Sequence, residues 1–194
     1  MPLTAPPPDA IAGLSLSEIA RLAAEGQLPP VERWNPEHCG DSAMRILADG
    51  TWLHEGSPIG RPAMVRLFST LLRREADGGH VLVTPVEKLS IAVDDAPFVA
   101  VEMESEGTAE TSRIALRTNV GDILFLGPEH PLTVEDRGHG AHPYLRVRDG
   151  LDALVARPVY YALADLAITG PAGPGGAIGL WSDGTFFPLE QAES

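Results

Sequence analysis

The chain is poor in cysteine, in positive charge and in long apolar runs. Among its 194 residues there is one cysteine, Cys39, which excludes an intramolecular disulfide framework and fits a reducing compartment. Lysine and arginine number 14 against 27 aspartate and glutamate residues, and the net charge of −13 argues against nucleic acid as a partner, because such partners need a basic surface. No apolar run approaches the roughly 18–20 residues that cross a bilayer, and the first residues lack the pattern of a secretory signal. We therefore expect a cytoplasmic protein without a membrane span.

The scarce positive charge is concentrated between Arg61 and Lys88. This segment holds five cations and three anions, a local excess of two positive charges in an otherwise acidic chain, and Lys88 is the only lysine. Such a cluster can attract a small anion while the rest of the protein repels long polyanions. The segment therefore predicts a small anionic ligand as partner.

Proline, glycine and Asp-Gly pairs divide the chain into short elements. Three helices are expected within residues 15–26, 62–74 and 157–170, and Arg73 and Arg74 fall in the last turn of the second, where they would complement its dipole. Short apolar runs bounded by turn residues predict strands. The expected strands are residues 43–47, 51–54, 80–84, 88–93, 98–104, 113–119, 123–126, 132–134, 144–148, 151–155, 178–181 and 185–187.

One ordered pattern occurs twice. A strand, an Asp-Gly turn, a strand, an Arg-Pro helix start and a hairpin follow one another around Asp49 and again around Asp149. We interpret this pattern as a duplicated unit, the alternative being two unrelated hairpin-plus-helix units. The expected fold is α+β: two related units, each a curved, mostly antiparallel sheet or partial barrel packed with one helix. Residues 1–30 would be an extension with one helix, residues 31–97 the first unit and residues 98–194 the second, although the central strands could serve either half.

The stretch ILADGTWLHEGSPIGRPAMVRLFSTLLRRE, followed by HVLVTPVEKLSIAVDDAPFVA, resembles a bacterial family named domain of unknown function 1285. The resemblance extends from about Trp34 to Gln191 and rests on the Asp-Gly-Thr-Trp turn, the Arg-Leu-Phe-Ser helix and the Thr-Pro-Val-Glu-Lys strand in that order. It implies a duplicated core, a C-terminal half similar to a pleckstrin-homology fold and a cleft between the domains. It also implies a nucleotide-based ligand and a part in signal transduction, with no established activity or catalytic residue.

Arg61 is the first candidate ligand contact. It directly precedes Pro62 at an expected helix N-terminus, where unpaired N–H groups favour an anion, and its planar guanidinium suits a phosphate or carboxylate. The alternative is an arginine that pairs with a local acid.

Thr84, Glu87, Lys88 and Trp34 are the other candidates. The first three surround Pro85 between two apolar strands, and they would offer a hydroxyl, an acceptor for a ribose or base, and a phosphate contact. The alternative is a Glu87–Lys88 surface pair in a turn. Trp34 lies in an irregular stretch and is a candidate for stacking on a flat ligand, whereas the other two tryptophans are expected in the core.

Motifs for other chemistry are absent from the sequence. No zinc spacing, P-loop, dinucleotide-binding fingerprint or kinase signature occurs, and no activating pattern surrounds Cys39, so we expect no metal, no cofactor and no catalytic residue. We predict a non-enzymatic module that binds or senses an anionic, nucleotide-like ligand between its two units. The alternatives are a module that docks a signalling protein, and an enzyme that acts on the same ligand with Glu87 or an aspartate as base.

Overall fold

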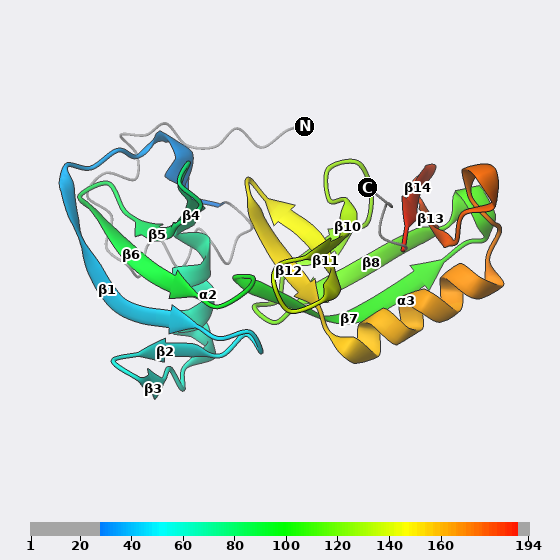
Figure 1. Cartoon of the computed structure of the whole chain (residues 1–194). Helices are drawn as coiled ribbons and strands as arrows, with labels where there is room; N and C mark the ends of the chain where they lie inside the picture. The colour runs from blue at the N-terminus through cyan, green and yellow to red at the C-terminus, as the bar shows by residue number, and fades with distance from the viewer. Residues whose placement is uncertain (1–27, 190–194) are drawn as a thin grey trace. The chain divides into compact units, whose positions relative to one another are not determined.

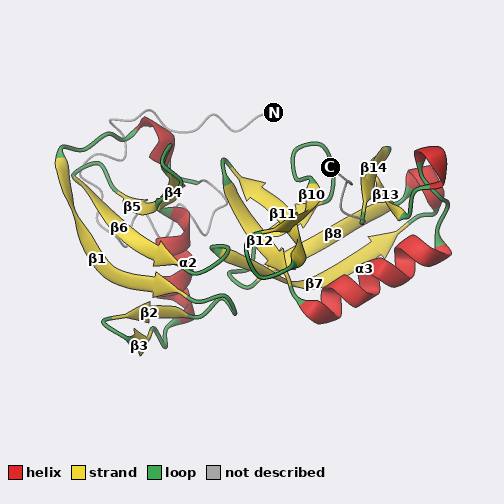
Figure 2. Ribbon diagram, viewed as in Figure 1, coloured by secondary structure: helices red, strands yellow, loops and turns green. Residues whose placement is uncertain are grey.

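The computed structural model describes residues 28–189 and divides the chain into two units. The first consists of Met1–Leu47 and Thr51–Asp94, and the second of Ala48–Gly50 and Asp95–Ser194. Within the described residues each unit has one six-stranded sheet and one α-helix (Figures 1 and 2). The expected α+β fold of two sheet-rich units is confirmed, whereas the helix expected within residues 15–26 lies outside the described part of the chain.

The described part of the first unit starts with a short 3₁₀ helix, which is followed by strands and one α-helix. Its sheet has the order β3-β2-β1-β6-β5-β4, in which β1 and β6 are parallel and all other neighbours are antiparallel. The elements are η2 (Val31–Arg33), β1 (His38–Ile46), β2 (Trp52–His54), β3 (Ser57–Pro58), α2 (Pro62–Thr70), β4 (Leu72–Arg74), β5 (His80–Val83) and β6 (Glu87–Val93).

The second unit has a sheet of order β10-β11-β12-β7-β8-β9, with β12 and β7 parallel and the other pairs antiparallel. Beyond this sheet it adds a helix and a separate hairpin, β13–β14. The elements are β7 (Phe98–Glu106), η3 (Ala109–Thr111), β8 (Arg113–Thr118), β9 (Ile123–Phe125), β10 (Leu132–Asp136), β11 (Ala141–Arg148), β12 (Leu151–Val155), α3 (Arg157–Thr169), η4 (Pro174–Gly176), β13 (Gly179–Ser182) and β14 (Thr185–Pro188).

The duplication is confirmed, but its spacing differs from the expected one. In each sheet three strands form a meander, three more form a second meander, and the first and sixth strands pair in parallel at the centre. This makes β1–β6 equivalent to β7–β12, and the copies begin at His38 and at Phe98. The equivalence expected for Asp49 and Asp149 is therefore wrong. The turn at Asp49 joins the first two strands of the first copy, β1 and β2, whereas the turn at Asp149 joins the last two strands of the second copy, β11 and β12. Asp-Gly recurs because it suits any tight hairpin.

Helix α2 is shorter than the sequence predicts. It ends at Thr70, and the hydroxyls of Ser69 and Thr70 donate to main-chain carbonyls three residues earlier, each at 2.7 Å. The chain then enters β4, where Leu72 pairs with Leu82 and is fully buried. The expectation that Arg73 lies in the last helical turn is wrong, because a run of apolar residues fits both periodicities and the pairing with β5 decides between them.

Helix α3 agrees with the sequence at both ends. It starts at Arg157 with proline as its second residue and stops before Gly170. Its residues Val159, Leu163 and Ala167, spaced four apart, are 4%, 0% and 4% exposed and form the buried face. The helix packs along β7 and against β13 (Figure 1). Within residues 28–189 no helix combines the length and the apolar character that crossing a membrane requires.

Candidate functional site

Arg61 is the N-cap residue of α2. Its backbone is extended, its carbonyl accepts hydrogen bonds from the N–H groups of Met64 and Val65, and its side chain is exposed. No other described residue forms a hydrogen bond or ion pair with its guanidinium, so pairing with a local acid is not seen in the described part of the chain. The side chain of Arg61 is therefore available to an anion, which is the role predicted for it from the sequence.

Thr84 closes the turn that precedes β6. Its N–H donates to the carbonyl of Glu87 at 2.9 Å, and its hydroxyl accepts from the N–H of Val86 at 3.4 Å and of Glu87 at 3.2 Å. The hydroxyl expected to meet a ligand is thus engaged in the turn itself. Lys88 pairs with Glu75 and not with its neighbour Glu87: its Nζ lies 3.3 Å from Glu75 Oε2.

Trp34 is buried instead of exposed. It retains 5% exposure, and its carbonyl accepts a hydrogen bond from Arg73 Nη1 at 2.7 Å. The same nitrogen donates to the carbonyl of Val31 at 2.8 Å. Because the ring faces the core of the first unit, it presents no open face for stacking, and that role stays a prediction that requires this segment to open.

A cluster of Arg73, Glu75 and Lys88 was not foreseen from the sequence. Arg73 Nε donates to Glu75 Oε1 at 2.7 Å, and Lys88 approaches the other oxygen of the same carboxylate. Partial burial alone would raise the pKa of Glu75, but the hydrogen bonds and charges of Arg73 and Lys88 outweigh burial and hold that pKa below its usual range. The available signal was the Gly78-Gly79 turn, which closes the β4–β5 hairpin and brings Glu75 back toward β6.

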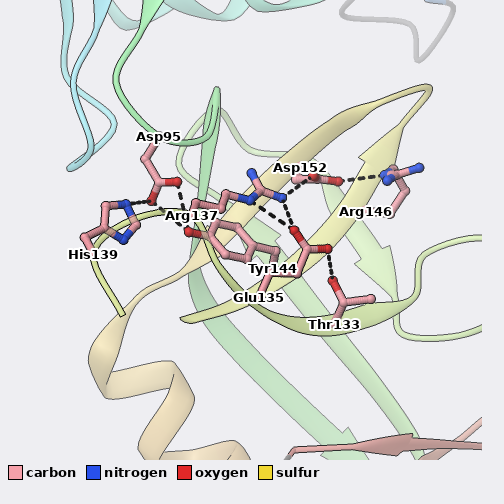
Figure 3. A network of polar contacts seen from close by, with 8 residues as sticks. All are labelled: Asp95, Thr133, Glu135, Arg137, His139, Tyr144, Arg146 and Asp152. Carbon is pink, nitrogen blue, oxygen red and sulfur yellow. Dashed lines mark hydrogen bonds and ion pairs between the residues drawn. The ribbon is translucent and has the colours of Figure 1, made fainter. Parts of the chain in front are cut away.

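A second polar network occupies the sheet of the C-terminal unit (Figure 3). Asp152 on β12 is 5% exposed and accepts from Arg137 Nη2 at 2.7 Å and from Arg146 Nε at 2.6 Å. Arg137 also binds Glu135 and lies 3.7 Å above the ring of Tyr144. The buried carboxylate is thus neutralised by two arginines.

Tyr144 connects this network to a histidine. Its hydroxyl donates to Asp95 at 2.9 Å, and His139 Nε2 lies 3.6 Å from the same carboxylate, whose side chain is 3% exposed (Figure 3). Burial, followed by the hydrogen bond to Asp95, raises the pKa of Tyr144 well above its ordinary value. A carboxylate that orients a histidine is an arrangement used by general bases. Here the carboxylate also holds the phenol, and within residues 28–189 no group of three or more metal-ligating side chains is found.

The C-terminal unit contains a cavity of about 360 Å³. Its walls come from the loop and 3₁₀ turn between β7 and β8, from the end of α3 and from β13. None of the lining residues within the range 28–189 is charged. They are Gly107, Thr108, Ala109, Ser112, Ile114, Leu166, Thr169, Gly170, Pro171, Gly179, Leu180 and Trp181.

The wall between β7 and β8 is held in place by its backbone. Gly107 has a φ of +77°, and a Cβ there would lie 2.6 Å from the carbonyl oxygen of Thr111, so the turn requires glycine. Ser182 Oγ on β13 accepts from the N–H of Ile114 at 3.0 Å and donates to the carbonyl of Leu126 at 2.7 Å, both fully buried bonds. These contacts fix the hairpin β13–β14 against β8, and both β13 and β8 contribute residues to the cavity wall. The sequence carried one signal for it, the Gly- and Pro-rich stretch 170–176 after the helix.

Comparison with known proteins gives two family matches and two similar structures. The N-terminal domain model of DUF1285, a domain of unknown function, matches residues 29–96, and the C-terminal domain model of the same family matches residues 97–189. The crystal structure of a DUF1285 family protein from Silicibacter pomeroyi DSS-3 is 46% identical, with a TM-score of 0.78, and the match covers 92% of this chain and 96% of that chain. A DUF1285 family protein from Shewanella baltica OS155 is 24% identical over 64% of this chain and 91% of that chain; its TM-score of 0.50 indicates a similar fold alone. None of the curated proteins compared with the chain matches it.

Proposed function

The chain belongs to the DUF1285 family, and from that premise we propose that it is a small-molecule-binding module whose ligand occupies the cavity of the C-terminal unit. The observation that carries the proposal is the cavity itself. Its volume of about 360 Å³ falls in the range of roughly 300–1,000 Å³ that is typical of ligand pockets. Apolar walls with a few polar groups are likewise typical of such sites.

The polar clusters support this choice by elimination. Asp152 has two arginine partners, Asp95 binds a phenol and a histidine, and Glu75 binds an arginine and a lysine. Each carboxylate is therefore already neutralised or hydrogen-bonded by the chain itself. The described residues that line the cavity, by contrast, include no charged partner that a ligand would have to displace.

An anionic, nucleotide-like ligand near Arg61, with a part in signal transduction, is a second and separate proposal. It is supported by the exposed side chain of Arg61 at the start of α2 and by the local excess of positive charge. Its ligand would differ from that of the cavity, so the two proposals are tested separately. Docking of a signalling protein and enzymatic turnover stay alternatives without a specific observation in their favour.

The test of the cavity is a filled variant with a control on the same helix. Leu166 lines the cavity, whereas Ile168 on α3 is 71% exposed and does not. Binding of indole, naphthalene-2-carboxamide and naphthalene-2-carboxylate would be measured by calorimetry on the wild type, Leu166→Trp and Ile168→Trp. We expect binding of at least one probe that Leu166→Trp abolishes and Ile168→Trp preserves, with circular dichroism showing that both variants fold.

Two results would overturn the proposal. Either no probe binds the wild type, or the two variants bind alike. Thr169→Trp, which enters the cavity from the last turn of α3, replaces Leu166→Trp if that variant does not fold.

A further inference from the structure

The lining of the cavity restricts the chemistry of its ligand. We infer that the ligand is a neutral, planar molecule of about two fused rings with one polar edge, an inference that rests on the proposed function of the cavity. Charge, wall shape, polar groups and volume each contribute one part of this description.

The lining disfavours an ionised group inside the cavity. Among residues 28–189, no arginine, lysine, histidine, aspartate or glutamate lines the cavity. An ionised group that leaves water for such a site loses hydration without gaining a counter-charge. This ligand therefore differs in charge from the one expected near Arg61.

The aromatic wall favours a flat ligand. Trp181 lines the cavity, and its ring is held by Phe186 at 5.3 Å between centroids. Its Nε1 is buried and has no hydrogen-bond partner among the residues that the structure describes, so the accessible part of the indole is carbon. The space above the neighbouring Gly179 is already filled by the chain, since a Cβ there would lie 2.3 Å from the carbonyl oxygen of Phe187 and 2.6 Å from the ring of Phe186. The indole of Trp181 is therefore the group that favours a flat ring.

Two hydroxyls supply the polar edge. Thr108 and Ser112 belong to the lining, and neither hydroxyl forms a hydrogen bond with another residue in the described part of the chain. The hydroxyl of Thr169, on the opposite element, donates to the carbonyl of Asp165 at 2.7 Å and is engaged. A hydroxyl both donates and accepts, so this edge fits an amide, a carbonyl or a ring nitrogen.

The volume sets the size. A closed apolar cavity of about 150 Å³ holds one benzene ring. The cavity of this chain, at about 360 Å³, is more than twice as large. It therefore has room for two fused rings with a substituent.

The experiment uses four substituted probes that share a two-ring, ten-carbon skeleton, together with unsubstituted naphthalene. Naphthalene-2-carboxamide is neutral, naphthalene-2-carboxylate is anionic, naphthalene-2-carboxamidine is cationic, and decahydronaphthalene-2-carboxamide is neutral but not flat. Dissociation constants would be measured by calorimetry with the full chain. The indole N–H signals of the three tryptophans would be followed by NMR, with Trp181→Phe identifying the signal of Trp181.

The neutral planar amide should bind at least about tenfold more tightly than either ion, because desolvation of the charge costs more than 1.4 kcal/mol. Its affinity should exceed that of the saturated amide by about threefold to tenfold, the range expected for loss of aromatic stacking. Binding should shift the Trp181 signal and leave those of Trp34 and Trp52 in place. Thr108→Val should weaken the amide more than it weakens naphthalene itself.

The outcomes separate this inference from the function on which it rests. If the carboxylate or the amidine binds as tightly as the amide, and Leu166→Trp still abolishes that binding, the cavity is the site but its ligand is charged, and the inference fails alone. If the saturated amide binds equally well, planarity is refuted. If Leu166→Trp has no effect on any probe, both the site and its ligand class fall.

Discussion

Substitution of Arg73 tests the fold of the first unit most directly. A position at the end of helix α2 and a position in strand β4 predict different losses of unfolding free energy. As an exposed cation at the end of a helix it would contribute about 0.3–1 kcal/mol through the helix dipole. In the structure it is 9% exposed, donates to two main-chain carbonyls at 2.7 and 2.8 Å, and binds Glu75. Its removal leaves buried acceptors and a carboxylate without their donor. We expect Arg73→Ala to lower the free energy of unfolding of this unit by about 3–5 kcal/mol.

The assay is urea unfolding followed by tryptophan fluorescence in a Trp181→Phe background, so that both remaining tryptophans report on the first unit. Arg66→Ala is the matched control, since Arg66 is an exposed residue of α2, and it should change stability by less than about 0.5 kcal/mol. Arg73→Lys keeps the charge but not the planar fork, and its loss should be intermediate. A loss below about 1 kcal/mol for Arg73→Ala, equal to that of the control, would refute the strand position and favour the helix end.

The pH dependence of the same cluster has a fixed sign. In the folded chain the hydrogen bonds and charges of Arg73 and Lys88 lower the pKa of Glu75 from its ordinary value of 4.5. The stabilisation is therefore fully present above that ordinary value and is lost as the pH falls through the folded pKa. Glu75→Gln should show a smaller loss of stability on acidification than the wild type, measured by unfolding at pH 6 and then below pH 4. Parallel curves for the two proteins would contradict the ion pairing.

Three further predictions concern single side chains. Tyr144→Phe should lower the free energy of unfolding by about 1–3 kcal/mol, because Asp95 loses a hydrogen-bond donor. Folding raises the pKa of Tyr144, so the stability that its proton provides should be complete below pH 10 and decline above it. Denaturation at alkaline pH would measure this decline. Gly107→Ala should destabilise more than Gly184→Ala in thermal melts, because both have positive φ but only at Gly107 would the Cβ clash; equal losses would deny the clash. Arg61→Ala should abolish any thermal shift caused by nucleotides without changing the melting temperature of the free protein, and an unchanged shift removes Arg61 from that site.

The sequence predicts the helices and strands better than it predicts which strands correspond in the two copies. Turn residues placed α3 and most strands correctly, since glycine, proline and Asp-Gly act locally. The repeat was misaligned because the same Asp-Gly signal serves two different hairpins, and only strand pairing reveals which strands correspond. The cavity was not foreseen for a related reason: Thr108, Leu166 and Trp181 are far apart in sequence, and none carries a motif. Arg61 alone could be judged from its neighbours, because its role depends on one helix start.

The duplication itself indicates where function resides. The six strands of each copy share one path, so they are explained by the need to build and cover a sheet. The cavity walls come from what is not repeated: η3 replaces the tight turn between β1 and β2, α3 follows the sixth strand, and β13 belongs to a hairpin without a counterpart among the described residues of the first unit. Of the lining residues only Ile114 lies in a repeated strand. Substitutions in the shared strands should therefore change stability in either unit, whereas substitutions in η3, α3 and β13 that leave the fold intact should change binding.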